Sequence, residues 1–145
     1  MIPRPLGPLR DLVGTVSEPL EKALAAGVAS HDLQSLLIRE LELPPRPTVL
    51  VVEDVHWADD ATLDLITVLG RRIGSLPALV VLTFRSGEAA HPLRAAVGAI
   101  RAEDSIYLEL GPLSEGAVAS LTGDGAADVY AATGGNPFYL SLIHI

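Results

Sequence analysis

The chain has 145 residues, enough for one domain with a hydrophobic core, and 49% of them are apolar, which argues against a disordered chain. Its formal net charge is −8 and its 10 basic residues are scattered, which excludes a duplex-DNA-binding surface of its own. There is no cysteine, no signal-peptide segment and no apolar run of the roughly 18 residues that a bilayer requires, and we therefore expect a cytoplasmic protein.

The N-terminal part of the chain predicts two amphipathic helices after an irregular start. Prolines at positions 3, 5 and 8 favour an extended or turn-like beginning. Apolar residues then recur at helical spacing over residues 9–26, although Gly14 and Pro19 weaken that run. Ser30, His31 and Asp32 form a helix start signal, and an apolar stripe follows at positions 33, 36, 37 and 41. Prolines at positions 44, 45 and 47 make a stiff connector to the next segment.

Two adjacent carboxylates end that next segment. Residues 48–54 read Thr-Val-Leu-Val-Val-Glu-Asp, an apolar and β-branched run that stops at Glu53 and Asp54. Such a run predicts a strand buried on both faces, as in a parallel sheet. Two acids at the point where a buried strand meets solvent are costly unless they bind something positive. The usual partner is a hydrated Mg²⁺ that carries phosphate, with the second acid free to handle a water molecule.

The segments after the acids alternate between helix and strand. Asp59 or Asp60 is expected to cap a helix that ends near the turn at residues 74–77. Residues 78–84 predict a second apolar strand, Pro92 suits the first turn of a further helix, and residues 106–110 alternate like a short third strand. This order predicts an α/β fold with a parallel sheet and right-handed crossovers.

From residue 111 onward the pattern becomes all-helical. Ser114 is expected to cap a helix that ends near Leu121, and residues 124–132 predict another helix. Gly134, Gly135, Asn136 and Pro137 interrupt the chain, and a helix restarts over residues 138–143. We therefore expect two parts, an α/β core over residues 1–110 and the start of a small helical domain over residues 111–145.

The acidic strand resembles the Walker B strand of a nucleoside triphosphatase. The chain contains no Gly-rich loop that ends in Lys-Ser or Lys-Thr, and Lys22, the only lysine, lies in a helical context. A phosphoacceptor receiver domain also begins with an apolar strand and paired acids. That class needs a further acid and a lysine after later strands, and both are missing here. A solvated acid pair at a strand end is the remaining alternative.

Other polar residues lie near the strand ends. Arg85 follows the second strand, where it would sense a terminal phosphate or form an ion pair with a nearby acid. We expect His56 to be a hydrogen-bonding structural residue rather than a base, Trp57 to pack on its loop, and Asp59 to cap the following helix. Residues 134–137 form either a turn between helices or a backbone corner that touches a nucleotide base.

Four separated blocks of the sequence point to one family. They read Val-Val-Glu-Asp-Val-His-Trp-Ala-Asp-Asp-Ala-Thr-Leu-Asp at 51–64, Leu-Thr-Phe-Arg at 82–85, Leu-Gly-Pro-Leu-Ser at 110–114 and Thr-Gly-Gly-Asn-Pro-Phe-Tyr-Leu at 133–140. At this separation they resemble the ATPase module of large LuxR-type transcriptional regulators, which are signal-transduction ATPases with numerous domains in the AAA-like P-loop class. The resemblance covers nearly the whole chain.

The resemblance assigns roles to individual residues. It implies that Glu53 is associated with Mg²⁺, that Asp54 activates a water and that Arg85 is a sensor of the terminal phosphate. Gly135, Asn136 and Pro137 match the motif with which the helical lid contacts the nucleotide. Glu53 departs from the pattern, because aspartate is commoner there.

A larger departure from the family pattern is that some of the segments expected from the resemblance lie outside residues 1–145. The first strand and the phosphate loop of the family would precede residue 1, and the sensor region and the DNA-binding helix-turn-helix would follow residue 145. The expected fold is therefore a partial P-loop sheet with flanking helices and the start of a lid. The family orders its strands 5-1-4-3-2, so without the first strand residues 106–110 lose a neighbour, and we expect that segment to be partly open.

The resemblance implies a fragment of an ATP-binding and ATP-hydrolysing regulator of transcription. ATP and Mg²⁺ are its expected cofactors in the intact protein, and we expect the isolated chain to be inactive and to bind ATP poorly, because most phosphate affinity comes from the phosphate loop. Self-association of the intact protein and contact with DNA through its helix-turn-helix are further expectations. The alternatives are a non-catalytic α/β interaction module with a vestigial site and, less favoured, a receiver domain.

Overall fold

The computed structural model describes residues 6–10, 12, 15–43, 47–85, 87 and 91–143. These residues belong to two compact units, Met1–Ile106 and Tyr107–Ile145, and each unit is described by itself below. The division falls within the segment for which the sequence predicts a third strand. No helix in the described part of the chain is long and apolar enough to cross a membrane.

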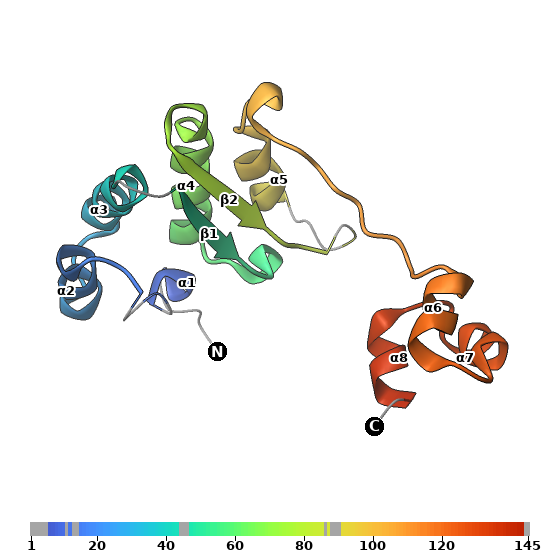
Figure 1. The fold of residues 1–145 in the computed structure, drawn as a ribbon. Helices are drawn as coiled ribbons and strands as arrows, with labels where there is room; N and C mark the ends of the chain where they lie inside the picture. The colour runs from blue at the N-terminus through green and yellow to red at the C-terminus, as the bar shows by residue number, and fades with distance from the viewer. Residues whose placement is uncertain are drawn as a thin grey trace. The chain divides into compact units, whose positions relative to one another are not determined.

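A two-stranded parallel sheet lies at the centre of the first unit, which confirms the predicted α/β class. β1 (Thr48–Val52) pairs with β2 (Ala78–Leu82) in a register that runs from Thr48 opposite Ala78 to Val52 opposite Leu82. α4 (Asp60–Gly70) connects them, so the three elements form a β-α-β unit, and Figure 1 shows the two arrows side by side and pointing the same way. Parallel pairing brings the carboxyl ends of both strands to one edge of the sheet.

The two faces of this sheet differ sharply in burial. Leu50 and Val52 of β1 are buried, whereas Val49 and Val51 between them are 58% and 50% exposed. Leu79, opposite Val49, is 56% exposed. The prediction that the acidic strand is buried on both faces is therefore wrong for this structure. The run of valines is compatible with a strand that is buried on both faces, but the described helices pack against only one face of the sheet.

Five helices of the first unit are α1 (Gly7–Arg10), α2 (Glu18–Ala26), α3 (Ser30–Glu42), α4 and α5 (His91–Gly98). The predicted helical run over residues 9–26 is thus divided into two helices, and Gly14 within it lies outside the described residues. The starts at Ser30 and near Pro92 are confirmed. α4 packs against α5 and α3, and α3 packs against α2. Their buried apolar residues are the leucines at 20, 24, 33, 37, 41, 65, 69 and 93, with Ile38, Ile66, Ala23 and Ala96.

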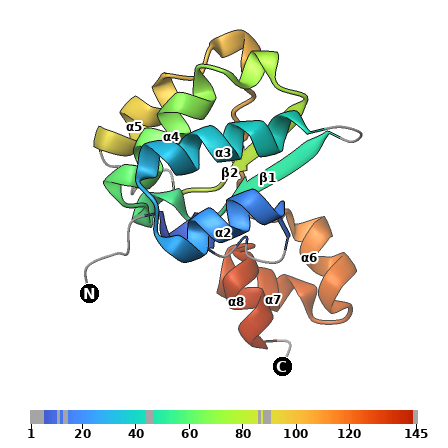
Figure 2. The same ribbon diagram turned by 90° about the vertical axis from the view of Figure 1, so that its left-hand side faces the viewer.

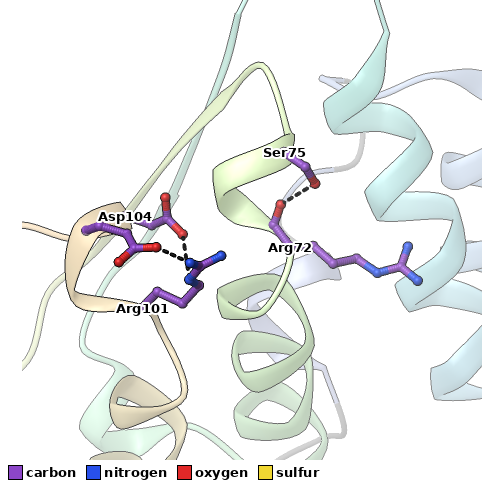
Figure 3. Close-up of polar contacts among 5 residues, drawn as sticks. Arg72, Ser75, Arg101 and Asp104 are labelled. Atoms are coloured by element: carbon purple, nitrogen blue, oxygen red, sulfur yellow. Dashed lines mark hydrogen bonds and ion pairs between the residues drawn. The ribbon is translucent and has the colours of Figure 1, made fainter.

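Three polar contacts lie near the ends of these helices. The backbone N–H of Ser17, which precedes α2, donates to Glu40 Oε1 of α3 at 3.0 Å. Short 3-10 turns, η2 (Ile73–Ser75) and η4 (Ala102–Asp104), follow α4 and α5. In Figure 3 the side chain of Arg101 points toward Asp104, with Nε 4.0 Å from Oδ2, and Ser75 Oγ donates to the backbone oxygen of Arg72 at 2.8 Å.

The close approach of those two turns explains one glycine. A Cβ on Gly74 would lie 2.5 Å from Asp104 Oδ1, nearer than Cβ atoms approach other atoms in real proteins. Glycine at this position therefore allows the carboxylate of Asp104 to pack directly on the η2 backbone.

Residues 106–110 are not a strand, so that prediction is wrong. The segment has no regular secondary structure, and Ile106, Leu108 and Leu110 are 87%, 76% and 91% exposed. Alternating residues satisfy the period of a strand, but a strand also needs a partner, and the described sheet contains β1 and β2 only. The exposure agrees with the expectation that this segment is open.

The second unit contains three short helices, α6 (Glu115–Thr122), α7 (Ala126–Thr133) and α8 (Pro137–Ile143). α7 packs against both α6 and α8, and the three form one cluster in Figure 2. Ser114 caps α6 as predicted, because its Oγ accepts from the Ala117 N–H at 3.2 Å. Val118 and Leu140 are the buried apolar residues of this small core.

Candidate functional site

The candidate site lies at the carboxyl edge of the sheet. Glu53 and Asp54 follow β1 directly and both are exposed. Beyond the strands, the Thr83 N–H donates to the Val52 oxygen at 3.1 Å and the Val55 N–H donates to the Thr83 oxygen at 2.9 Å. These bonds keep the two chain segments side by side past the last strand residues. The geometry therefore brings both predicted acids next to the segment that ends in Arg85.

Asp54 has an unusual backbone conformation. Its φ and ψ are 51° and 41°, in the left-handed region that non-glycine residues rarely adopt and that aspartate tolerates better than most. Its N–H donates to the hydroxyl Oγ1 of Thr83 at 3.0 Å. The turn at Asp54 begins the 3-10 helix η1 (Val55–Trp57), so the acid lies where the chain leaves the sheet.

His56 and Trp57 follow the acids and differ in burial. The side chain of His56 is 1% exposed, and its Nδ1 lies 3.8 Å from Asp54 Oδ1, beyond hydrogen-bonding distance. Trp57 is 72% exposed, with its ring centroid 5.2 Å from that of His56. The prediction that Trp57 packs on its loop is met only by this contact with the His56 ring, since most of the indole is exposed. A buried imidazole suits a structural role for His56.

Asp59 caps α4, which confirms its predicted role. Its carboxylate accepts from the N–H of Thr62 and from the Thr62 hydroxyl, both at 3.0 Å, and from the Leu6 N–H at 3.3 Å. Burial raises the pKa of Asp59, but hydrogen bonds from Thr62, Leu6 and Gly7 together lower it by more. Its pKa therefore lies below the ordinary value of 3.8. One carboxylate thus joins the N-terminal segment to the helix that follows the site.

Arg85 lies three residues beyond the end of β2 and is exposed. Its place in the chain puts it at the same edge of the sheet as Glu53 and Asp54, because β1 and β2 are parallel and in register. A guanidinium at that edge would serve a phosphate or a carboxylate equally well. The phosphate-sensing role of Arg85 stays a prediction.

The donor set at this edge suits one kind of metal ion. Among the described residues there is no group of three or more His, Cys, Asp and Glu side chains that would enclose a metal. Glu53 and Asp54 are two exposed carboxylates on a sheet edge, and Mg²⁺ keeps several waters and is often held by one or two carboxylates plus substrate phosphates. The pair therefore fits a hydrated Mg²⁺ delivered with phosphate better than a metal held by protein ligands alone.

The corner at residues 134–137 is a tight turn that backbone and side-chain hydrogen bonds hold in place. Gly134 and Gly135 have φ of 59° and 73°, and a Cβ on Gly135 would lie 2.1 Å from the Leu113 oxygen. The Leu113 N–H donates to the Gly135 oxygen at 2.8 Å. Asn136 Oδ1 accepts from the Phe138 N–H at 2.9 Å and so caps α8, which starts at Pro137. The turn between helices is thus observed, and contact of Gly135, Asn136 and Pro137 with a nucleotide stays a prediction.

Thr83 is the site residue that sequence reasoning misses. It is one of many threonines in the chain, and the Leu-Thr-Phe-Arg block draws attention to the arginine. The only signal available from sequence is its position near the end of the second predicted strand, residues 78–84. Its contact with Asp54 depends on the register between β1 and β2, which no local pattern specifies.

Comparison with known proteins identifies a domain in the first unit. The family model for the AAA ATPase domain matches residues 3–82, more than half of the chain, and includes Glu53 and Asp54. An uncharacterized protein of Rhizobium meliloti (strain 1021) is 36% identical over 77 residues, which cover 48% of this chain and 8% of that protein. The chain therefore spans under a tenth of this relative's length. No solved structure matches the chain.

Proposed function

The chain belongs to the AAA ATPase domain family, and from this we propose that it forms the Mg-ATP-binding and hydrolysing core of a regulatory ATPase within a longer protein. The observation that carries the proposal is the pair Glu53 and Asp54 at the carboxyl end of β1, beside the end of β2. Ligands of open α/β sheets bind outside the carboxyl ends of the strands, where these carboxylates lie.

The two carboxylates take different roles in the proposal. Bound Mg²⁺ would neutralise charge that develops on the transferred phosphate. Glu53 would hold the waters of this ion, and its extra methylene would let it reach them from the strand end. Asp54 would orient or deprotonate the attacking water, and Arg85 would bind the terminal phosphate.

The corner of the second unit adds a nucleotide contact to the proposal. Gly135, Asn136 and Pro137 would contact the adenine base, with the exposed Asn136 and Pro137 as the accessible part of the corner and the buried Gly135 packed against the Leu113 backbone. The tight turn between α7 and α8 supports this role, because it holds the corner in a single conformation.

We further propose that the ATPase controls transcription, as its likeness to LuxR-type regulators suggests. ATP and Mg²⁺ would favour a closed, signalling-competent state, and hydrolysis would reset it. DNA contact would come from a helix-turn-helix elsewhere in the longer protein, and self-association would depend on ATP. The great length of the Rhizobium meliloti relative supports a multidomain setting.

Loss of one carboxylate tests the proposal directly. In the longer protein Asp54→Asn should lower the kcat of ATP hydrolysis by about 10²- to 10⁴-fold, the range that a general base contributes. Asp64→Asn, an exposed acid on α4, is the matched control and should leave kcat unchanged. Unchanged turnover in Asp54→Asn would favour the alternative, a non-catalytic interaction module. Incorporation of label from acetyl phosphate would instead favour a receiver domain.

A further inference from the structure

Asp54 needs a partner that holds its backbone. Its φ of 51° lies in the left-handed region, and Leu6 is the other non-glycine residue with positive φ in the described part of the chain. Aspartate tolerates this region better than most residues, but the conformation still costs free energy that surrounding bonds can offset. The direction of the Asp54 carboxylate follows from this backbone conformation, because φ and ψ set the direction of the Cα–Cβ bond.

Thr83 makes three hydrogen bonds around that residue. Its N–H donates to the Val52 oxygen at 3.1 Å, its oxygen accepts from the Val55 N–H at 2.9 Å, and its Oγ1 accepts from the Asp54 N–H at 3.0 Å. The first bond continues the parallel ladder, and the second is shifted by one residue, because this register would otherwise use the Asp54 N–H; both are made by backbone atoms, so any residue except proline could make them. The third bond requires a hydroxyl, so it depends on the identity of Thr83.

His56 does not replace this bond. Its Nδ1 lies 3.8 Å from Asp54 Oδ1, which is too long for a hydrogen bond to the carboxylate. The Asp54 carboxylate itself remains 71% exposed and accessible to a ligand. The backbone bond to Thr83 therefore fixes Asp54 without occupying its carboxylate.

We propose that Thr83 is a positioning residue for Asp54: its hydroxyl holds the left-handed conformation that directs the carboxylate toward the carboxyl edge of the sheet. Thr83 touches neither metal nor nucleotide in this role and acts only through Asp54. Because Thr83 follows β2 and precedes Arg85 by two residues, the same bond also ties the acid to the segment that carries the arginine. The role in catalysis rests on the proposed ATPase function, whereas the conformational role does not.

Nuclear magnetic resonance of the 145-residue chain tests the conformational role. Thr83→Val removes the hydroxyl at nearly constant volume, Thr83→Ser keeps it, and Thr67→Val is a control that removes a hydroxyl bonded within α4 at 2.9 Å from the Leu63 oxygen. We expect Thr83→Val to move the Asp54 φ out of the left-handed region and to speed its amide exchange by roughly threefold to tenfold, the value of one hydrogen bond. Thr83→Ser and Thr67→Val should leave both quantities unchanged.

The outcomes separate this inference from the proposed function. An Asp54 φ and amide exchange that are the same in Thr83→Val as in the original chain would overturn the positioning role. If Thr83→Val does not fold, as judged by circular dichroism, Thr83→Ala gives the same comparison. In the longer protein Thr83→Val should lower kcat about tenfold or more with KM for ATP little changed, and Thr83→Ser should restore it. A loss of kcat that Thr83→Ser does not restore would also count against the hydroxyl.

Discussion

At the scale of single residues, Asp59 joins two segments near the site through hydrogen bonds of its carboxylate. It caps α4 and accepts a further bond from the Leu6 N–H at 3.3 Å. We expect Asp59→Ala to lower the free energy of unfolding by about 1–2 kcal/mol, the usual cost of a lost helix cap. Asp60→Ala is the control, because Asp60 is exposed and its neighbour makes the cap. Urea denaturation measures both, and an equal loss in the two variants would contradict the assignment.

The same residue predicts a dependence on pH. Hydrogen bonds outweigh burial and lower the pKa of Asp59 in the folded chain below its ordinary value of 3.8. The carboxylate therefore contributes its full stabilisation at pH values above the ordinary pKa, and this contribution is lost as the pH falls through the lower folded pKa. Asp59→Asn keeps a capping side chain without a charge. The difference in unfolding free energy between the original chain and Asp59→Asn should therefore shrink on acidification below pH 4. A difference that grows in acid would refute the assigned sign.

Gly135 provides a second test at the residue scale. Its φ is 73°, and an added Cβ would lie 2.1 Å from the Leu113 oxygen, so Gly135→Ala should destabilise the second unit by about 1–3 kcal/mol. Gly116→Ala is the matched control. A Cβ on Gly116 in α6 meets nothing within 4 Å, and alanine should stabilise the helix by roughly 0.5–1 kcal/mol. Thermal melting followed by circular dichroism distinguishes opposite signs, and a neutral Gly135→Ala would show that the corner can rearrange.

Residue-scale features divide into those that sequence predicts and those that it does not. The caps at Asp59 and Ser114 follow from a short polar residue before an apolar run, and both are confirmed. The left-handed Asp54 and its bond to Thr83 do not follow from any local pattern, since they depend on two segments that meet through the sheet register. Sequence locates the chemistry of the site but not the bonds that orient it.

At the scale of elements, β1 gives the clearest prediction. Val51 is 50% exposed and the adjacent Val52 is buried at 7%, although the two residues are identical in sequence terms. Threonine has the shape of valine and forms strands well, so Val51→Thr should change the free energy of unfolding by less than about 0.5 kcal/mol. Val52→Thr should cost roughly 1–3 kcal/mol, because it buries a hydroxyl. Denaturation curves in which Val51→Thr is the more costly change would mean that the exposed face is covered in solution.

The segment at residues 106–110 gives an exchange prediction. It is extended and exposed, and no strand of the described sheet pairs with it. We expect the Leu108 and Glu109 amides to exchange at rates near those of an unstructured chain. The control is the Val118 amide of α6, which donates to the Ser114 oxygen at 2.9 Å and should be slower by about tenfold or more. Strong protection at Leu108 and Glu109 would imply a third strand in solution.

Helices and strands differ in how far sequence predicts them. The starts of α3, α4, α5 and α6 carry local signals, and the structure confirms them. Strands depend on partners that lie far along the chain, and the valine run of β1 therefore gives its position but not the exposure of one face. The wrong prediction of a strand at residues 106–110 has the same cause. An alternating pattern favours a strand, but a strand forms only where a neighbouring strand pairs with it.

At the scale of the whole molecule, charge and motif content limit what the chain can bind alone. A net charge of −8 produces a field that repels polyanions such as duplex DNA and free ATP. The acids at the sheet edge add to that repulsion until a cation neutralises them. The proposed site would therefore favour ATP only as its Mg²⁺ complex, and the phosphates would need cationic or N–H donors from some other part of the protein.

The 145-residue chain offers few such donors, so we expect it to bind Mg-ATP weakly. High phosphate affinity in this class comes from a Gly-rich loop and its lysine, and the sequence contains no such loop. Its one lysine, Lys22, lies on the surface of α2, 2.5 Å from Glu18, and is 75% exposed. Calorimetry should detect no Mg-ATP binding by the chain at micromolar concentrations, and the longer protein should bind at least 10²-fold more tightly, because each backbone N–H and charge of a phosphate loop adds to affinity. Micromolar affinity in the chain alone would mean that Arg85 and the sheet edge suffice to hold the phosphates. The proposal that phosphate affinity comes from another part of the longer protein would then be wrong.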